Sequence, residues 1–123
     1  MRSNEFLIQT KDFLMQSYDE YKKYIQFHNI NYLRQASGKL FTVAENLVEY
    51  KTNVYVDSFS KFRNLITKTN IKYKDLLVSQ VFQLHVFYYH GEAEGLTQND
   101  ISHLYLKVYH ELKRSLKWEI WKE

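Results

Sequence analysis

Two histidines and two tyrosines gather near residue 90 and are the first candidates for chemistry. They are His85, Tyr88, Tyr89 and His90, in the segment LHVFYYHG that ends at Gly91. A tyrosine pair can stack on a nucleobase, whereas helical metal pairs prefer a spacing of four residues. His85 and His90 are five residues apart, so they diverge by about 140° on a helix. We therefore expect no metal site, a His85 hydrogen-bonded inside the fold, and tyrosines that close the end of a helix bundle.

A stripe of basic residues follows near the C-terminus, at steps of four and three that place it on one helical face. Its members are His103, Lys107, His110, Arg114 and Lys117. Regularly spaced cations suit a phosphate backbone, although histidine is fully charged only below about pH 6.5. The predicted nucleic-acid-binding residues are Lys72, Lys74, Lys107, Arg114 and Lys117. The alternative is an ordinary solvated helix face, and the same alternative holds for Arg34 and Lys39.

Two tryptophans in the terminal segment WEIWKE are candidates for a protein interface. Trp118 and Trp121 are too apolar for a freely solvated tail, and tryptophan is enriched among interface anchors. We expect a homodimer contact here, with the alternative that both rings fold back onto the core of their own chain.

Other chemistries are not indicated by the residue types present. The chain has no Cys, no Pro and three Gly, so disulfide and thiolate chemistry is excluded. Neither a glycine-rich phosphate loop nor a Ser/His/Asp arrangement is recognisable. We therefore expect no cofactor and no catalytic residues.

Length and composition indicate one globular domain covering residues 1–123. The scarcity of turn residues favours long helices over a β fold. The net charge of +3 permits nucleic-acid binding without requiring it. A signal peptide and a membrane span are not recognisable, so we expect a soluble, cytoplasmic protein with no membrane partner.

Periodic apolar residues predict the helices that position these candidates. Helices are expected over 4–27, 32–54, 75–90 and 97–121. The helix over 75–90 has apolar residues on two adjacent faces, which predicts the most buried helix. The segment 52–74 is ambiguous: TNVYVDSF could form a strand, but a helical extension or a short helix around Phe59–Ile66 is preferred, followed by a basic loop. The expected fold is an antiparallel bundle of four to five helices.

Three segments resemble one known family in their order and spacing. They are QASGKLF (35–41), KYKDL (72–76) and LHVFYYHG (84–91). They are similar to the QASEKLW-type signature, the basic entry into the third helix and the LHxNFYEG signature of small archaeal helical proteins of the paREP type. These are related to the HEPN superfamily (higher eukaryotes and prokaryotes nucleotide-binding).

The chain departs from these signatures at four positions. Gly38 replaces a glutamate, Phe41 a tryptophan, Phe87 an asparagine and His90 a glutamate. The resemblance implies a HEPN-like bundle that often dimerises. Catalytic HEPN ribonucleases carry an Arg followed, after four to six residues, by His, and no Arg of this chain has that spacing. The resemblance therefore implies a non-catalytic protein.

The leading functional hypothesis is a protein that binds RNA, a nucleotide or a protein partner such as a nucleotidyltransferase. The resemblance alone implies the context, which is archaeal defence or a toxin–antitoxin pair. The alternative is a homodimeric structural module of viral or mobile-element origin with no nucleic-acid role. A third hypothesis, an unusual nuclease, would require His85 or His90 to act with Tyr88 or Tyr89.

Overall fold

The described residues form five helices: α1 (Asn4–Phe27), α2 (Ile30–Thr52), α3 (Phe59–Ile66), α4 (Lys74–His90) and α5 (Gln98–Lys122). The computed structural model describes residues 4–72 and 74–122, with side chains as far as Ile120. Within these residues there is no strand, only an isolated bridge between Ala93 and Leu96 in the α4–α5 turn. In the same ranges, every helix is too short or too polar to cross a membrane. The predicted all-α helical bundle is confirmed.

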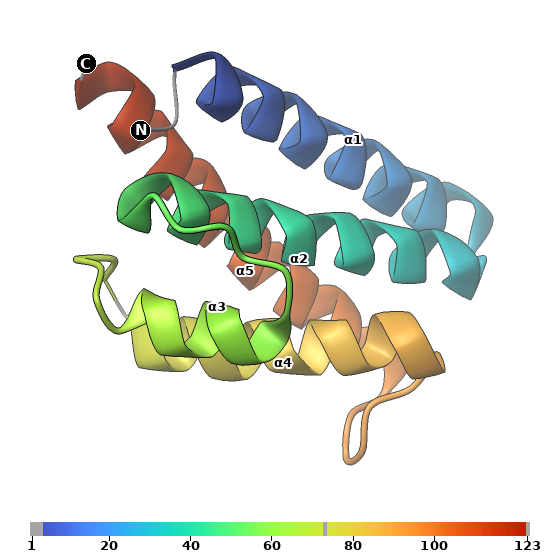
Figure 1. The fold of residues 1–123 in the computed structure, drawn as a ribbon. Helices are drawn as coiled ribbons and strands as arrows, with labels where there is room; N and C mark the ends of the chain where they lie inside the picture. The colour runs from blue at the N-terminus through green and yellow to red at the C-terminus, as the bar shows by residue number, and fades with distance from the viewer. Residues whose placement is uncertain (1–3, 73, 123) are drawn as a thin grey trace.

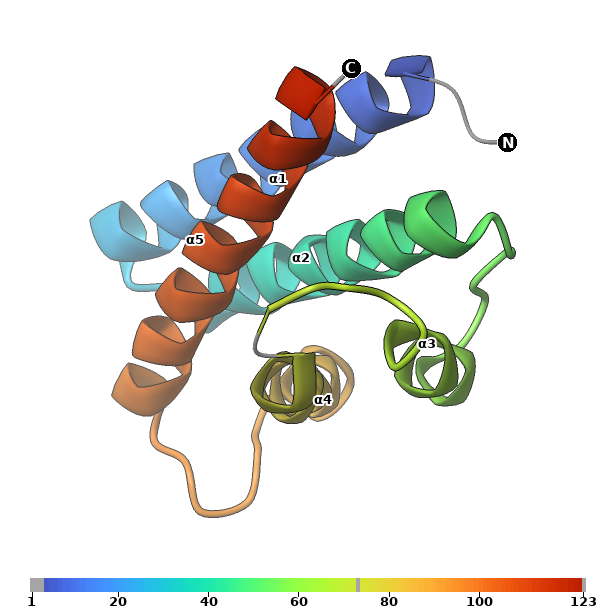
Figure 2. The same ribbon diagram turned by 90° about the vertical axis from the view of Figure 1, so that its left-hand side faces the viewer.

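The second helix lies at the centre of the bundle. In Figure 1, α1 runs along one side of α2 and α4 along the other, while α3 lies beside α4. Figure 2 shows α5 crossing α1 and α2 obliquely, on the side of the molecule away from α3. Nine residues of α2 are buried, among them the small Ala36, Ser37 and Ala44, which let neighbouring helices approach closely. The centre of the bundle is therefore built on α2.

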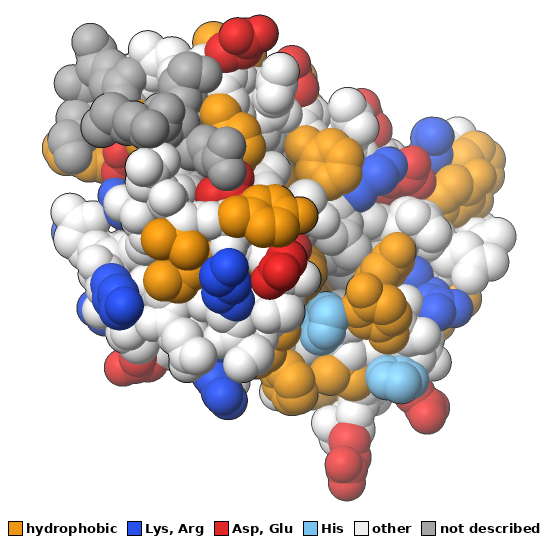
Figure 3. Space-filling view, viewed as in Figure 1, with side chains coloured by type: hydrophobic (Ala, Val, Ile, Leu, Met, Phe, Trp, Pro, Cys, Tyr) orange, Lys and Arg blue, Asp and Glu red, His pale blue; other side chains and the backbone are white. Residues whose placement is uncertain are grey.

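The prediction that residues 75–90 form the most buried helix is wrong. Only four residues of α4 are buried, and three of its large apolar side chains, Leu76, Phe82 and Tyr89, are exposed. Figure 3 shows hydrophobic side chains at the surface on this side of the molecule. An apolar pattern around the whole circumference normally indicates burial, but here one side of α4 has no helix to cover it.

The ambiguous segment 52–74 contains a short helix and two loops. Helix α2 ends at Thr52, where Asn53 takes a left-handed conformation (φ 57°) and donates its backbone N–H to Glu49. Ser58 then caps α3 by accepting the backbone N–H of Lys61. The strand interpretation is therefore wrong, whereas the short helix around Phe59–Ile66 is confirmed.

The start of α5 agrees with its sequence signal. The Thr97 backbone N–H donates to the Asp100 carboxylate at 2.9 Å, and the Asp100 backbone N–H donates to Thr97 Oγ1 at 3.1 Å. This reciprocal pair is a capping box with Asp in place of Glu. Hydrogen bonding to the carboxylate, first from the Thr97 backbone and then from the Thr97 side chain, lowers the pKa of the Asp100 carboxyl.

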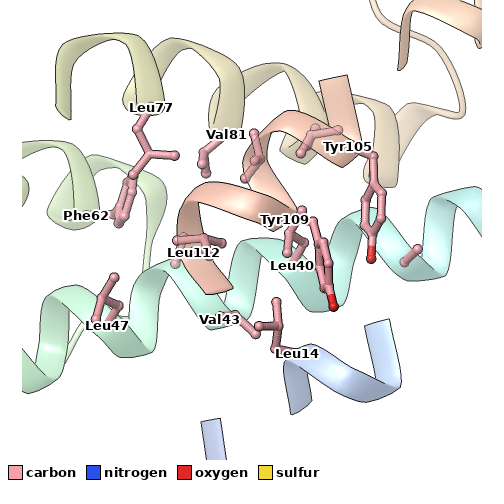
Figure 4. Close-up of a cluster of buried hydrophobic side chains, with 14 of the residues drawn as sticks. Leu14, Leu40, Val43, Leu47, Phe62, Leu77, Val81, Tyr105, Tyr109 and Leu112 are labelled. Carbon is pink, nitrogen blue, oxygen red and sulfur yellow. The ribbon is translucent and has the colours of Figure 1, made fainter. Parts of the chain in front are cut away.

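All five helices contribute to one hydrophobic core, which includes Leu14, Leu40, Phe62, Val81 and Leu112 (Figure 4). Between α1 and α5 the core also contains hydroxyl groups.

These hydroxyl groups form two hydrogen-bonded pairs. Ser17 Oγ donates to the carbonyl oxygen of Ala36 and lies 2.8 Å from Tyr105 Oη, while Tyr21 Oη lies 2.8 Å from Ser102 Oγ. Burial raises the pKa of Tyr105. Because each of these four hydroxyls has a partner, the hydrogen bonds offset the cost of removing them from water.

Candidate functional site

The basic stripe predicted from the sequence lies on the outer face of α5. Its five side chains, His103, Lys107, His110, Arg114 and Lys117, are all exposed. Arg114 forms an ion pair with Glu111 one turn earlier on the same helix. The stripe is therefore accessible to a ligand along its whole length.

One cavity brings together residues that the sequence placed in different groups. Lys72, from the α3–α4 loop, and Arg114 line a cavity of about 340 Å³ together with Trp118. The Trp118 side chain is 64% exposed. A buried ion pair between Lys51 and Glu119 also borders this cavity. We call it the Trp118 cavity; it combines the exposed Lys72 and Arg114 with an accessible indole ring, and Glu111, the ion-pair partner of Arg114, also lines it.

Lys74, predicted to bind nucleic acid, does not line the Trp118 cavity. The Lys74 ammonium donates to the carbonyl oxygens of Thr67 and Thr69 at 3.0 and 3.1 Å, so Lys74 holds the loop that precedes α4. The side chain of Trp121 lies outside the described part of the structure. Its predicted interface role stays a prediction.

Lys117 borders a second groove, which runs between α1 and α5 and has a volume of about 530 Å³. The rings of Tyr18 and Tyr109 stack in this groove with centroids 4.6 Å apart. Lys22 lies over the Tyr18 ring at 5.7 Å and Lys113 over the Tyr109 ring at 5.8 Å. The basic surface of α5 thus extends onto α1.

A third depression, of about 620 Å³, separates α2 from α4 on the side of the molecule seen in Figure 3, and we call it the α2–α4 groove. It is lined by residues of QASGKLF and of LHVFYYHG, the two segments that are farthest apart among those carrying the resemblance. His85, Tyr88 and Tyr89 of the predicted helix-end cluster all border it. His90, the last residue of α4, is exposed.

His85 does not make the hydrogen bond that we expected. Its ring lies 4.5 Å from the Phe41 ring and 6.0 Å from the Phe59 ring, measured between centroids. Its buried Nδ1 atom has no hydrogen-bond partner among the described residues. Burial, followed by the nearby His90, lowers the pKa of His85. An aromatic enclosure therefore holds His85 as a neutral imidazole at neutral pH.

The tyrosines differ from each other in burial. Tyr88 packs against Gly38 of α2, where an added Cβ would lie 2.6 Å from two of its ring carbons. Tyr89 is 62% exposed, so the expectation that both rings close the end of the bundle is wrong for Tyr89. The ring of Tyr89 is accessible to a ligand because no helix covers that side of α4.

The end of α4 is held by an arginine that the sequence indicated as solvated. Arg34 Nε and Nη2 donate to the carbonyl oxygen of Tyr88 at 3.1 and 2.9 Å, and Nη2 also donates to that of Tyr89 at 3.2 Å. A cation at the C-terminus of a helix is favoured by the helix dipole. Lys39 also has a partner, since its ammonium lies 3.3 Å from the Glu20 carboxylate.

Two carboxyl groups of the α2–α4 groove were missed at the level of sequence. The buried Glu49 carboxylate accepts the backbone N–H of Val56 at 3.0 Å, which folds the loop 53–58 back along α2. Asp57 of this loop thereby lies near Glu45 at the groove. Burial, and then the charges of Asp57 and Glu49, raise the pKa of Glu45 to about 7. Glu45 lies 12 positions before Asp57, and no motif connects them.

The described residues contain no group of three or more side chains suited to bind a metal ion. Comparison of the chain with models of known protein families, with curated proteins and with solved structures finds no match.

Proposed function

We propose that this protein is a non-catalytic, HEPN-like binding protein whose α5 surface binds single-stranded RNA. One observation carries the proposal: Lys72 and Arg114, from distant parts of the chain, border the same cavity as the exposed ring of Trp118. The protein would act in the cytoplasm, alone or with a nucleotidyltransferase partner, in a defence or toxin–antitoxin context in an archaeon.

The chemistry of the α5 surface matches that of known single-strand binding sites. Such sites combine a positively charged path for the backbone with aromatic rings on which bases stack. Here the exposed Lys107 and Arg114 provide the path along the helix, and Trp118 provides a ring beside it. Neutralised phosphates release counterions, so binding would weaken as salt increases.

The proposed kinship is supported by the contact between the two resembling segments, because QASGKLF and LHVFYYHG line one groove. Two departures from the signatures also have a physical explanation. Phe87 is buried in the core, where an asparagine would need hydrogen-bond partners. Gly38 adjoins the Tyr88 ring, which occupies the space of a side chain.

The test is binding of a fluorescent single-stranded oligouridine, measured by anisotropy at low and high salt. Lys107→Glu combined with Arg114→Glu should weaken binding about tenfold or more and flatten the dependence on salt. Trp118→Ala should weaken binding by about 1 to 3 kcal/mol through lost stacking. The matched control is Lys61→Glu with Arg63→Glu, which makes the same charge change on α3, on the opposite side of the bundle from α5 (Figure 2). Equal weakening by both double variants, or no binding by the unmodified protein at low salt, would contradict the proposal.

The same Trp118→Ala variant tests the alternative of a homodimeric interaction module, which the exposed Trp118, Met15 and Ile8 favour. Sedimentation analysis over a range of concentrations measures the oligomeric state. A dimer that Trp118→Ala dissociates, in a protein that does not bind RNA, would support the alternative.

Gel analysis of the RNA after incubation tests the third hypothesis, an unusual nuclease. Cleavage that is lost on His85→Ala or His90→Ala would support it.

A further inference from the structure

The α2–α4 groove has the size and lining of a small-molecule site, and it shares no lining residue with the α1–α5 groove. Its volume of about 620 Å³ is within the range of roughly 300 to 1,000 Å³ that is usual for ligand sites. Aromatic rings form much of its wall, contributed by Phe41, Phe59, Tyr88 and Tyr89. A ligand with an apolar or planar body can pack against such rings.

The charges at the groove are unbalanced. Glu45 and Asp57 both border it, and neither forms an ion pair within the described residues. Lys39 is the one cationic side chain among the described residues that line it, and it is paired with Glu20 on α1. His85 contributes no charge at neutral pH because burial lowers its pKa. The groove thus presents carboxyl groups without a compensating cation.

Glu45 shows the consequence of this imbalance. Its pKa of about 7 reflects burial without a neutralising partner, next to Asp57 and Glu49. A positively charged ligand would supply the missing charge and favour the ionised carboxylate. A metal ion is a poorer match, since the described residues offer no cluster of three ligating side chains. Aromatic faces, by contrast, attract organic cations.

We propose that the α2–α4 groove binds a small organic cation, an alkylammonium or guanidinium group on an apolar body. The charged nitrogen lies between Glu45 and Asp57, and the apolar body packs against Phe41, Phe59 and Tyr89. This site is separate from the α5 surface and does not depend on RNA binding.

The experiment is isothermal titration calorimetry of the full chain with phenethylamine and agmatine. The matched control ligand is 2-phenylethanol, which has the body of phenethylamine without its charge. Both cations should bind, and the alcohol should not. Glu45→Gln should weaken cation binding about tenfold or more, because a charge-assisted hydrogen bond is lost, and Asp57→Asn should act in the same direction. Glu94→Gln makes the same charge change in the exposed α4–α5 turn and should leave affinity unchanged.

The pH dependence provides a further test of the same site. Below about pH 7 a proton on Glu45 competes with the cation, so affinity should be about tenfold lower at pH 6 than at pH 8. The groups facing Glu45 are Asp57, Glu49, Lys39 and His85, and burial lowers the pKa of His85 below its usual value. His85→Phe should therefore keep the pH dependence, and Glu45→Gln should remove it.

Three results would overturn the inference: no binding of either cation at millimolar concentration, equal binding of the alcohol, or unchanged affinity in Glu45→Gln. Oligouridine binding measured on the same Glu45→Gln sample reports whether the α5 surface is intact. Loss of cation binding with RNA binding retained would show that the two sites are independent.

Discussion

At the scale of single residues, Glu45 carries a cost to stability. Its carboxyl is half-buried beside Asp57 and Glu49, and its pKa is raised to about 7. When the pKa of a carboxyl is higher in the folded state than in the unfolded state, ionising it destabilises the fold. The free energy of unfolding therefore falls as pH rises through the interval between the two pKa values. Here the interval extends from about 4.5 to about 7. Destabilising groups of this kind are common at functional sites.

Glu45→Gln should therefore stabilise the protein at pH 8 and have little effect at pH 4, where the native carboxyl is already protonated. The expected gain at pH 8 is roughly 1 to 2 kcal/mol, less than the full pKa shift implies because solvent screens a partly exposed group. Urea denaturation at both pH values measures it. Glu94→Gln, in the exposed turn, serves as the control and should change little at either pH. A destabilised Glu45→Gln at pH 8 would contradict the assigned environment.

At the scale of helices, the packing of α2 against α4 depends on Gly38. Glycine in a helix interior costs about 1 kcal/mol relative to alanine, so its presence needs a compensating contact. That contact is the Tyr88 ring, whose Cδ1 and Cε1 atoms would lie 2.6 Å from an added Cβ. The Arg34 hydrogen bonds to the end of α4 hold the two helices at this separation.

Gly38→Ala should thus destabilise the protein by about 1 to 2 kcal/mol, because overpacking outweighs the gain in helix propensity. In a Tyr88→Ala background the same change should become stabilising by up to about 1 kcal/mol, since the ring is no longer there. Thermal or urea unfolding of the four proteins completes the double-mutant cycle. If Gly38→Ala had the same effect in both backgrounds, the ring contact would not be the reason for the glycine.

At the scale of the whole molecule, an ion pair joins the C-terminal ends of α2 and α5. Lys51 and Glu119 are 68 residues apart in the chain, and their side chains are only 12% and 7% exposed. Breaking a buried pair by removing one partner leaves an uncompensated charge and costs about 3 to 5 kcal/mol, whereas replacing both partners by apolar residues is often neutral.

Lys51→Met alone should accordingly destabilise the fold by about 3 to 5 kcal/mol, and Lys51→Met with Glu119→Leu should recover most of that loss. Lys39→Met removes one partner of a pair that is more exposed, at 28% and 19%, and should cost about 1 kcal/mol or less. Chemical denaturation monitored by circular dichroism measures all three variants. The interpretation would be falsified if the double variant were as unstable as the single one.

Much of this architecture could be predicted from local sequence signals. The four long helices follow from apolar periodicity, and the start of α5 from Thr97 and Asp100, because both signals involve neighbouring residues. The central position of α2 could not be predicted in this way. It depends on which helix faces have neighbours, and α4 is apolar on a side that no helix covers.

The candidate sites show the same division between local and long-range information. The α5 stripe is a local pattern, and the structure confirms that its side chains are exposed. The meeting of Lys72 with Trp118 and of Glu45 with Asp57 depends on how two loops return to the helices. A backbone hydrogen bond to Glu49 positions the second loop, and no spacing rule reports such a contact.

The two hydroxyl pairs between α1 and α5, Ser17 with Tyr105 and Tyr21 with Ser102, also determine which alignments of the helices are permitted. If α5 slipped by one turn along α1, Ser17 would keep its hydrogen bond to Ala36, but the hydroxyl groups of Tyr105, Tyr21 and Ser102 would lose their partners. That misalignment costs on the order of several kcal/mol. If leucines replaced these residues, the interface between α1 and α5 would still pack, but it would not select one register. The hydroxyl pairs thus specify one register of the two helices. That register also fixes the shape of the basic surface that α1 and α5 share.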